Sequence, residues 1–358
     1  MKRILCFCYA AIGLAAFLTP SAIAASYQIA DIPWLGPGVP RVQGINNTGM
    51  VVGTADSGSS ASAFTWSASA GTAYLSPLGG PRSEAYAVSD TGQVVGYSTL
   101  GYPSPSRACL WEAGEPALDL GALPSGQYLP SSIAADINAS GQIVGTSMSS
   151  TGHYHAFLWS SGTGIEDLNG TDDPDGTRAV AINDDGTVVG AHAHNGFIWT
   201  RATGRLDISI PGLLIGAVDI NNSGQVILQA ITPAVNGPAY LWQEGHDLID
   251  LGALPGLSPH GIEARDINNL GQVVGSSNQK AFVWDFTDGI QALPLPSGFS
   301  QSSAGAINDR GLIAGTARGA DGMWHLLLWT PIPEPSSLAA LLAGLAGFGA
   351  VMRRRRKT

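Results

Sequence analysis

Seven stretches of the chain share one alternation of apolar and polar positions. An aliphatic residue is followed by a polar turn that starts with Asn or Ser and ends with Gly, and then by an aliphatic pair, as in residues 267–274. The turn glycines are Gly49, Gly92, Gly141, Gly186, Gly224, Gly271 and Gly311. Asn or Ser first and Gly fourth are favoured in type I hairpin turns. Each stretch therefore predicts two antiparallel strands.

Each hairpin is followed by two more strand-like segments. A second Gly usually stands four residues after the turn Gly, which suggests a close backbone approach or a bend, and a variable loop then leads to a segment that ends in Trp. A fourth short segment follows in most copies, as in 119–124. The turn glycines are 43, 49, 45, 38, 47 and 40 residues apart, the period of a four-stranded propeller blade. We therefore predict an all-β, seven-bladed β-propeller.

The seven repeated tryptophans are expected in the core between blades, because equivalent residues at one register argue for packing. The seventh repeat runs from Ala304 to Trp329 and lacks a fourth segment of its own. Residues 31–38 have no turn before them and align with 119–126. A closed ring would leave no exposed sheet edges. We predict that the N-terminal strand, within 26–36, pairs with the strand that ends at Trp329.

The start of the chain has the pattern of a secretory signal peptide. Two basic residues precede an apolar run and a small-residue site, which predicts a signal in residues 1–24 with cleavage after Ala24. The propeller domain is then expected in 25–331. Cys109 is the one cysteine left after cleavage, so no internal disulfide is expected. It stands where other repeats have an aromatic residue, which favours a buried thiol.

The end of the chain carries a second signal-like pattern. A Pro-Glu-Pro triplet precedes the apolar run 338–352, and arginines follow it. These residues are Pro333, Glu334, Pro335, Arg353, Arg354, Arg355 and Arg356. The run is short for a membrane span, which usually needs about 20 residues, and the arginines should stay cytoplasmic. A short apolar helix with transient inner-membrane insertion is expected.

This C-terminal pattern resembles the PEP-CTERM sorting signal of Gram-negative bacteria. The resemblance implies that an exosortase recognises and removes the sorting segment 332–358, and that the protein is associated with exopolysaccharide. The repeats resemble the HAF family of extracellular repeats, and 155–159 (His-Ala-Phe-Leu-Trp) carry the full motif. Together the two resemblances imply a protein that is membrane-anchored before processing and afterwards secreted or at the cell surface.

Charge narrows the choice of partners. Seven of the 17 basic residues and one of the 27 acidic residues lie in the terminal segments, so residues 25–331 carry a net charge of about −16. No basic patch is evident, and a chain of this charge is a poor ligand for nucleic acids or anionic membranes. We expect no nucleic-acid partner.

Two groups of residues raise the question of a metal. His153 and His155 alternate and would share a strand face, and the His192 and His194 pair has the same spacing. Zinc, however, needs three or four converging ligands, and only pairs are visible. A run rich in aspartate resembles the start of a calcium loop, but the expected Glu is missing, so a solvated turn is the simpler interpretation. Its residues are Asp172, Asp173 and Asp175.

No recognisable catalytic or cofactor-binding motif occurs in the sequence. The prediction is therefore no catalytic residue, no cofactor and no metal. We expect an exported, non-enzymatic protein that interacts with the cell surface or with extracellular matrix, including exopolysaccharide. The alternative is a polysaccharide lyase or glycoside hydrolase on the same scaffold, because a carboxylate pair in the channel could come from scattered loops.

Overall fold

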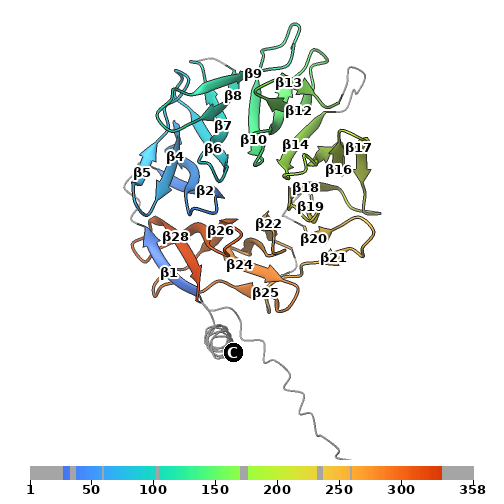
Figure 1. The fold of residues 1–358 in the computed structure, drawn as a ribbon. Helices are drawn as coiled ribbons and strands as arrows, with labels where there is room; N and C mark the ends of the chain where they lie inside the picture. Colours follow the sequence, from blue (N-terminus) through green and yellow to red (C-terminus); the bar gives the residue numbers. More distant parts are fainter. Residues whose placement is uncertain are drawn as a thin grey trace, which may run out of the picture.

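The computed structural model describes residues 27–32, 38–58, 60–101, 105–169, 176–231, 237–258 and 260–332. These residues form 28 strands in seven four-stranded antiparallel sheets, which are arranged around a central axis (Figure 1). The predicted all-β, seven-bladed propeller is confirmed. We number the blades 1 to 7 from β2–β5 onward.

The strands of blades 1 to 6 run outward from the axis in chain order, and blade 7 has β1 as its outermost strand. The innermost strands are β2 (Val39–Ile45), β6 (Ser83–Val88), β10 (Ser132–Ile137), β14 (Thr177–Ile182), β18 (Ile215–Ile220), β22 (Ile262–Ile267) and β26 (Ser302–Ile307). The second strands are β3 (Val51–Asp56), β7 (Val94–Thr99), β11 (Ile143–Met148), β15 (Val188–His192), β19 (Val226–Ala230), β23 (Val273–Ser277) and β27 (Ile313–Arg318). The third strands are β4 (Ala61–Ser67), β8 (Ser106–Trp111), β12 (Tyr154–Ser160), β16 (Asn195–Thr200), β20 (Ala239–Trp242), β24 (Lys280–Asp285) and β28 (Trp324–Pro331). The outermost strands are β5 (Gly71–Tyr74), β9 (Leu118–Gly121), β13 (Gly164–Asp167), β17 (Gly204–Ile208), β21 (Ile249–Asp250), β25 (Gly289–Ala292) and, for blade 7, β1 (Tyr27–Ile32).

The turn between the first two strands has the predicted form. In blade 1 the Gly49 N–H donates to the Asn46 carbonyl oxygen at 3.0 Å, and Gly49 has a φ of +86°. The same bond and a positive φ recur at the other six turn glycines. A residue with a Cβ atom would be strained there, which explains why the position is always Gly.

The second glycine of the repeat, which Leu228 replaces in blade 5, lies beside a β-bulge. In blade 1 Val42 pairs with Gly53 and Gly44 with Val52, so Gln43 has no partner on the second strand. A Cβ atom on Gly53 would lie 2.0 Å from the Arg41 carbonyl oxygen. The same register shift occurs in every blade. The bulged residue of each of blades 1 to 6 lines a cavity on the axis, and in blade 7 it is Gly305, which has no side chain.

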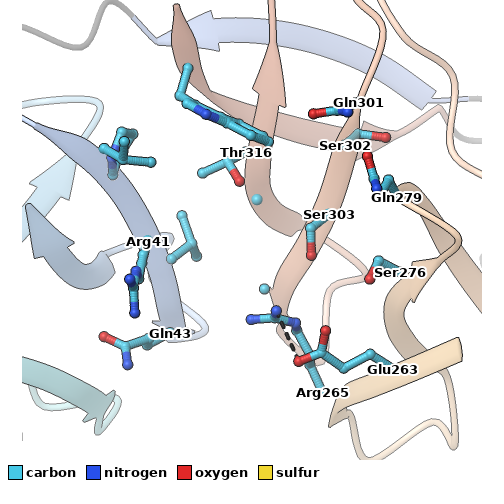
Figure 2. Close-up of a pocket in the computed structure, with 16 residues that line it drawn as sticks. Arg41, Gln43, Glu263, Arg265, Ser276, Gln279, Gln301, Ser302, Ser303 and Thr316 are labelled. Atoms are coloured by element: carbon cyan, nitrogen blue, oxygen red, sulfur yellow. Dashed lines mark ion pairs between the residues drawn. The ribbon is translucent and has the colours of Figure 1, made fainter. Parts of the chain in front are cut away.

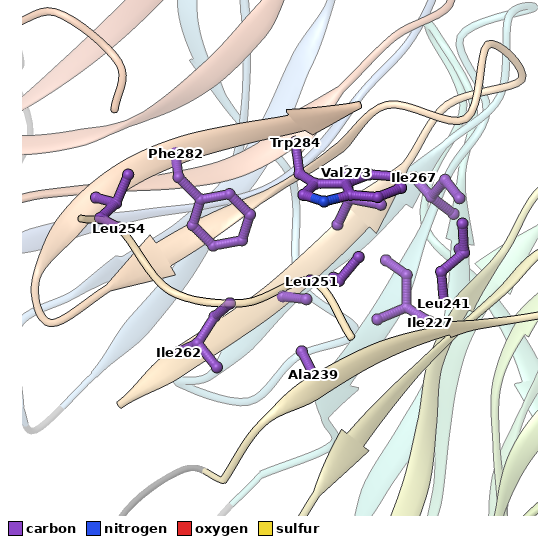
Figure 3. Close-up of a cluster of buried hydrophobic side chains, with 11 residues drawn as sticks. Ile227, Ala239, Leu241, Leu251, Leu254, Ile262, Ile267, Val273, Phe282 and Trp284 are labelled. Atoms are coloured by element: carbon purple, nitrogen blue, oxygen red, sulfur yellow. The ribbon is translucent and has the colours of Figure 1, made fainter. Parts of the chain in front are cut away.

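The hydrophobic core lies between the blades. One cluster joins Ile227 and Leu241 of blade 5 to Ile262 and Trp284 of blade 6 (Figure 3). The repeated tryptophans belong to such clusters, as predicted. Trp111, Trp199, Trp284 and Trp329 are buried, and Trp66, Trp159 and Trp242 are half-buried against the same clusters. Cys109 is also buried, as expected, and burial raises the pKa of its thiol.

The ring is closed by the N-terminal strand. β1 pairs with β28, with Ile29 opposite Trp329, and in Figure 1 the two lie side by side in blade 7. Ile32 is buried in a cluster shared by blades 7 and 1. The predicted closure is confirmed for residues 27–32.

Other predicted features lie outside the described residues. They are the cleavage site at Ala24, the aspartates Asp172, Asp173 and Asp175, and the sorting-signal residues Pro333, Glu334, Pro335, Arg353, Arg354, Arg355 and Arg356. Within the described part of the chain, the structure has no helix of the length and apolarity that a membrane crossing requires. The apolar run 338–352 is not in that part.

Candidate ligand site in the central channel

Cavities along the axis form a channel with two unlike ends. At one end, called the turn end, a cavity of about 220 Å³ is lined by the hairpin turns of all seven blades. At the other end, called the open end, a cavity of about 790 Å³ lies between blades 6, 7 and 1. Gln43 and Arg265 line this open-end cavity and also a smaller one further inside. The open end is therefore the part of the channel with room for a ligand.

A ring of buried amide side chains lines the turn end. In six blades the first turn residue is Asn, and its Nδ2 atom donates to the carbonyl oxygen of the equivalent residue in the next blade at 2.9 to 3.3 Å. The donors are Asn46, Asn138, Asn183, Asn221, Asn268 and Asn308. Each Oδ1 atom also accepts an N–H from its own turn. Blade 2 has Ser89 instead, so this ring lacks its link from blade 2 to blade 3.

A second ring uses the next turn residue. Its backbone N–H donates to a side-chain oxygen of the equivalent residue in the following blade at 2.8 to 2.9 Å. The acceptors are Asn47, Asp90, Asp184, Asn222, Asn269 and Asp309. Blade 3 has Ala139, which has no side-chain oxygen to accept from blade 2. Both rings are thus interrupted at the junction of blades 2 and 3.

Three half-buried aspartates link blades just inside the rings. Asp136 accepts the Ile182 N–H at 2.8 Å, Asp219 the Ile267 N–H at 2.9 Å and Asp266 the Ile307 N–H at 2.7 Å. Burial raises the pKa of Asp136 to about 7 and also raises the pKa values of Asp219 and Asp266. Because each carboxyl group bonds to the next blade, we assign these aspartates a structural role.

Side chains at the open end differ from blade to blade. The position four residues before the end of each innermost strand lines the open-end cavity in blades 1, 6 and 7, and the position two residues before the end lines the channel cavities in every blade. The first position holds Arg41, Glu84, Ile133, Arg178, Gly216, Glu263 and Ser303, and the second holds Gln43, Tyr86, Ala135, Val180, Val218, Arg265 and Gly305. Long polar side chains at both positions occur in blades 1, 2 and 6. The chemistry of the channel is therefore concentrated on one side.

The open-end cavity brings several of these side chains together. Figure 2 shows Arg41 and Gln43 on one wall, Glu263 and Arg265 on the facing wall, and Ser303 between them. The Arg265 guanidinium lies 3.0 Å from a Glu263 carboxylate oxygen. The Ser303 Oγ atom is buried, and no hydrogen-bond partner for it exists among the described residues. Its hydrogen-bonding capacity is unused within the described residues.

A second polar cluster lies on blade 2. The Tyr86 and Tyr97 hydroxyl groups donate to the two Glu84 carboxylate oxygens at 3.1 and 2.8 Å. Burial, together with Glu84, raises the pKa of Tyr97 to about 12 and raises the pKa of Tyr86 further. Both hydroxyl groups therefore stay protonated at neutral pH and hold Glu84 in place.

The histidines proposed for metal binding do not converge. His153 precedes β12 and is exposed, whereas His155 lies within β12, is buried, and binds Asp167 at 2.9 Å. The expectation that the two share a strand face is therefore wrong, because the strand begins after His153. His194 is exposed in a hairpin turn, and His192 lies 3.3 Å from Asp207. Within the described ranges no group of three candidate ligands is placed to hold a metal ion.

Comparison with known proteins supports the fold. No protein-family model and no curated protein matches the sequence. Virginiamycin B lyase from Staphylococcus aureus is similar in structure, with a TM-score of 0.56 and 12% identity over 86% of this chain and 99% of that chain. A streptogramin B lyase is similar as well, with a TM-score of 0.58 and 11% identity over 86% of this chain and 98% of that chain.

A third similar structure is a propeller described as having an open velcro topology. It is the propeller domain of the Trilobed protease from Pyrococcus furiosus, with a TM-score of 0.53 and 11% identity over 81% of this chain and 95% of that chain. At these identities the three likenesses show the fold alone.

Proposed function

We propose that this protein is an exported, non-enzymatic binding protein of the cell surface or extracellular matrix. Its ligand is a saccharide chain that enters the open end of the channel. The secretory pattern of residues 1–24 supports export, and the resemblance to HAF repeats supports an extracellular location. The open-end cavity of about 790 Å³ has the size of a ligand site.

One observation carries the non-enzymatic assignment: the channel carboxyl groups already have partners. Glu84 accepts from two tyrosine hydroxyl groups, and Glu263 is paired with Arg265. The three deeper aspartates accept backbone N–H groups of the neighbouring blades. Glycoside hydrolysis generally needs two carboxyl groups that flank the scissile bond, and among the described residues that line the open-end cavity Glu263 is the one acidic residue.

A polysaccharide lyase or glycoside hydrolase is the second candidate. The unlike polar residues of blades 1, 2 and 6 at one end of the channel favour it, because active sites combine different side chains from different repeats. The two lyases of similar fold show only that such a scaffold accommodates an enzyme.

The two candidates differ in one measurement. Purified protein is incubated with matrix polysaccharide, binding is followed by calorimetry, and the polysaccharide is then analysed for shorter chains. We expect saturable binding without cleavage. Shorter chains that appear with wild-type protein, and disappear when Glu84→Gln is used, would establish the enzyme instead.

The proposed export route includes removal of the C-terminal segment. The Pro-Glu-Pro triplet at 333–335 and the arginines at 353–356 support an exosortase as the processing partner. We expect the intact mass of protein isolated from the cell exterior to lack the segment that follows the triplet. An exported protein that still ends at Thr358 would contradict this route.

A further inference from the structure

The open-end cavity contains the residues that depart from the repeat. Trp324 stands outside the register of the seven repeated tryptophans, and it lines the cavity. Gln279 occupies the equivalent position in blade 6, five residues before the repeated Trp, and it also lines the cavity. Packing explains a residue type that recurs in every blade, but it does not explain these two.

The backbone conformation of Gln279 is a second observation that points to a ligand site. Asn278 and Gln279 form the two-residue turn between β23 and β24, with φ values of 48° and 66°. Such turns favour Gly or Asn, and Gln is strained at positive φ. Strained residues cluster at ligand sites. Gln279 thus has a less stable backbone where its side chain reaches the cavity.

The charges of the cavity favour an anion. It is lined by two arginines and one carboxylate in a chain with a net charge of −10. Arg41 also pairs with Asp56 at 3.1 Å, and Arg265 pairs with Glu263 at 3.0 Å. A guanidinium has five N–H donors in a planar fork that matches a carboxylate. Each arginine therefore keeps donors for a ligand.

The neutral lining favours a ligand that carries many hydroxyl groups. Gln43, Gln279, Gln301, Ser303 and Thr316 bring amide and hydroxyl groups to the cavity wall. Trp324 is half-buried and offers an amphipathic ring of the kind that contacts a sugar ring. Gly305 lets blades 7 and 1 approach closely beside the cavity, because a Cβ atom there would lie 2.4 Å from the Val42 carbonyl oxygen.

We infer that the open-end cavity binds an acidic saccharide, with a carboxylate of the ligand held by Arg41 and Arg265 and a sugar ring on Trp324. This inference rests on the proposed binding function and specifies its ligand class. Gln279 and Ser303 orient the hydroxyl groups. The site discriminates by charge, because a neutral sugar leaves both guanidinium groups without a new partner.

The test compares three probes of matched length by calorimetry on the full chain: a hexasaccharide of uronic acid, a neutral glucose hexasaccharide and hexaglutamate. We expect the uronate to bind at least tenfold more tightly than either of the others, because a hydrogen bond to a charged group is worth about a factor of ten or more. Equal affinity for the neutral sugar would overturn the inference and leave the proposed function standing. Equal affinity for hexaglutamate would overturn the role of the sugar ring, and failure of both sugars to bind would overturn both proposals.

Matched variants locate the site. Arg41 and Arg178 occupy the same repeat position, but only Arg41 lines this cavity. Arg41→Gln should weaken uronate binding about tenfold or more, whereas Arg178→Gln should change it less than twofold. Similar losses in both would show attraction by general charge and overturn the inference. Trp324→Phe should retain most of the affinity that Trp324→Leu loses.

The variant Gln279→Gly distinguishes a loss of ligand affinity from a loss of folding stability. Glycine relieves the strained turn, so the variant should unfold at a higher temperature than the wild type and yet bind uronate several-fold more weakly. A variant that is more stable and binds as well as the wild type would exclude Gln279 from the site. Because this change stabilises the fold, unfolding cannot account for lost binding.

Discussion

The two ends of the channel use the same repeat in opposite ways. At the turn end, equivalent positions hold nearly the same residue in every blade, and asparagine side chains link six of the seven blades to the next. At the open end, equivalent positions hold Arg, Glu, Ile or Gly, and one side of the channel gathers the polar ones. The repeated end fixes the ring and the varied end is available for binding. The residues that stabilise the ring and the residues available to bind a ligand therefore lie at opposite ends of the channel.

Removal of the closing strand should produce the largest effect. A variant without residues 27–32 loses buried Ile32 and exposes the edge of β28. Burial of a single Ile is worth roughly 2 to 5 kcal/mol, and a free strand edge promotes association. We expect a destabilisation of more than about 4 kcal/mol and aggregates in size-exclusion chromatography.

The exposed strand residue Gln28 supplies the control, since Gln28→Ala should behave as the wild type. A truncated protein that stays monomeric and melts at the wild-type temperature would show that blade 7 is stable with three strands. The turn-end rings would then suffice to close the propeller.

Two tryptophans on the same strand test the difference between repeated and varied positions. Trp329 is fully buried, and its Nε1 atom donates to the Pro294 carbonyl oxygen at 2.7 Å. Trp329→Ala should cost about 3 to 5 kcal/mol of unfolding free energy, as large-to-small core changes do. Trp324→Ala should cost about 1 kcal/mol, because the half-buried Trp324 lines a cavity.

Urea unfolding of both variants measures this contrast directly. Equal losses would mean that Trp324 is part of the core, and the open end would lose its distinction from the turn end. A large loss at Trp324 alone would reverse the assignment.

The fold was predictable because its rules are local. The turn from Asn46 to Gly49 specifies its hairpin through neighbouring residues, and seven copies specify the architecture. Ring closure could be predicted because the segment around Asp31 resembles the fourth strand of a repeat, has no hairpin before it, and matches the strand that the seventh repeat lacks. The bulge was only hinted at, since Gly53 indicates a close approach without saying which backbone atom approaches it.

The channel contacts were not predicted, because they join blades that are distant in sequence. Asn46 looked like a turn residue, yet its side chain also donates to Ser89 in the next blade. A signal was present: the second turn position is Asn or Asp in six copies, although the turn itself does not require it. The open-end site could have been suspected from unlike residues at equivalent positions, such as Arg41 and Glu84. Which of them converge depends on how the blades are arranged.

The half-buried Asp136 should make stability depend on pH in an unusual direction. Its pKa is raised from 3.8 to about 7 in the folded protein, so between these values the folded state holds a proton that the unfolded state has released. The unfolding free energy therefore falls as pH rises from about 4 to about 7, by up to about 1.4 kcal/mol per unit. Asp136→Asn should remove this part of the slope and should be more stable relative to the wild type at pH 8 than at pH 4.

Chemical unfolding at several pH values measures the slope, and Asp185→Asn, an exposed change of the same charge, is the control. Identical slopes for Asp136→Asn and the wild type would mean that the carboxyl group is ionised in the fold. The link from blade 3 to blade 4 would then be a charged one.

The smallest expected effect is a gain, at the junction where both rings are interrupted. Ser89 already accepts the Gln93 N–H through its Oγ atom, as the asparagines of other blades do through Oδ1, but it has no amide group to reach blade 3. Ser89→Asn should add the missing bond to the Asn138 carbonyl oxygen and stabilise the protein by about 0.5 to 1.5 kcal/mol. Ser89→Ala should instead destabilise it, and uronate binding at the open end should be unchanged in both variants. If Ser89→Asn destabilises the protein as Ser89→Ala does, the junction of blades 2 and 3 has a geometry that excludes the repeated link, and the interruption is a property of the fold rather than of one residue.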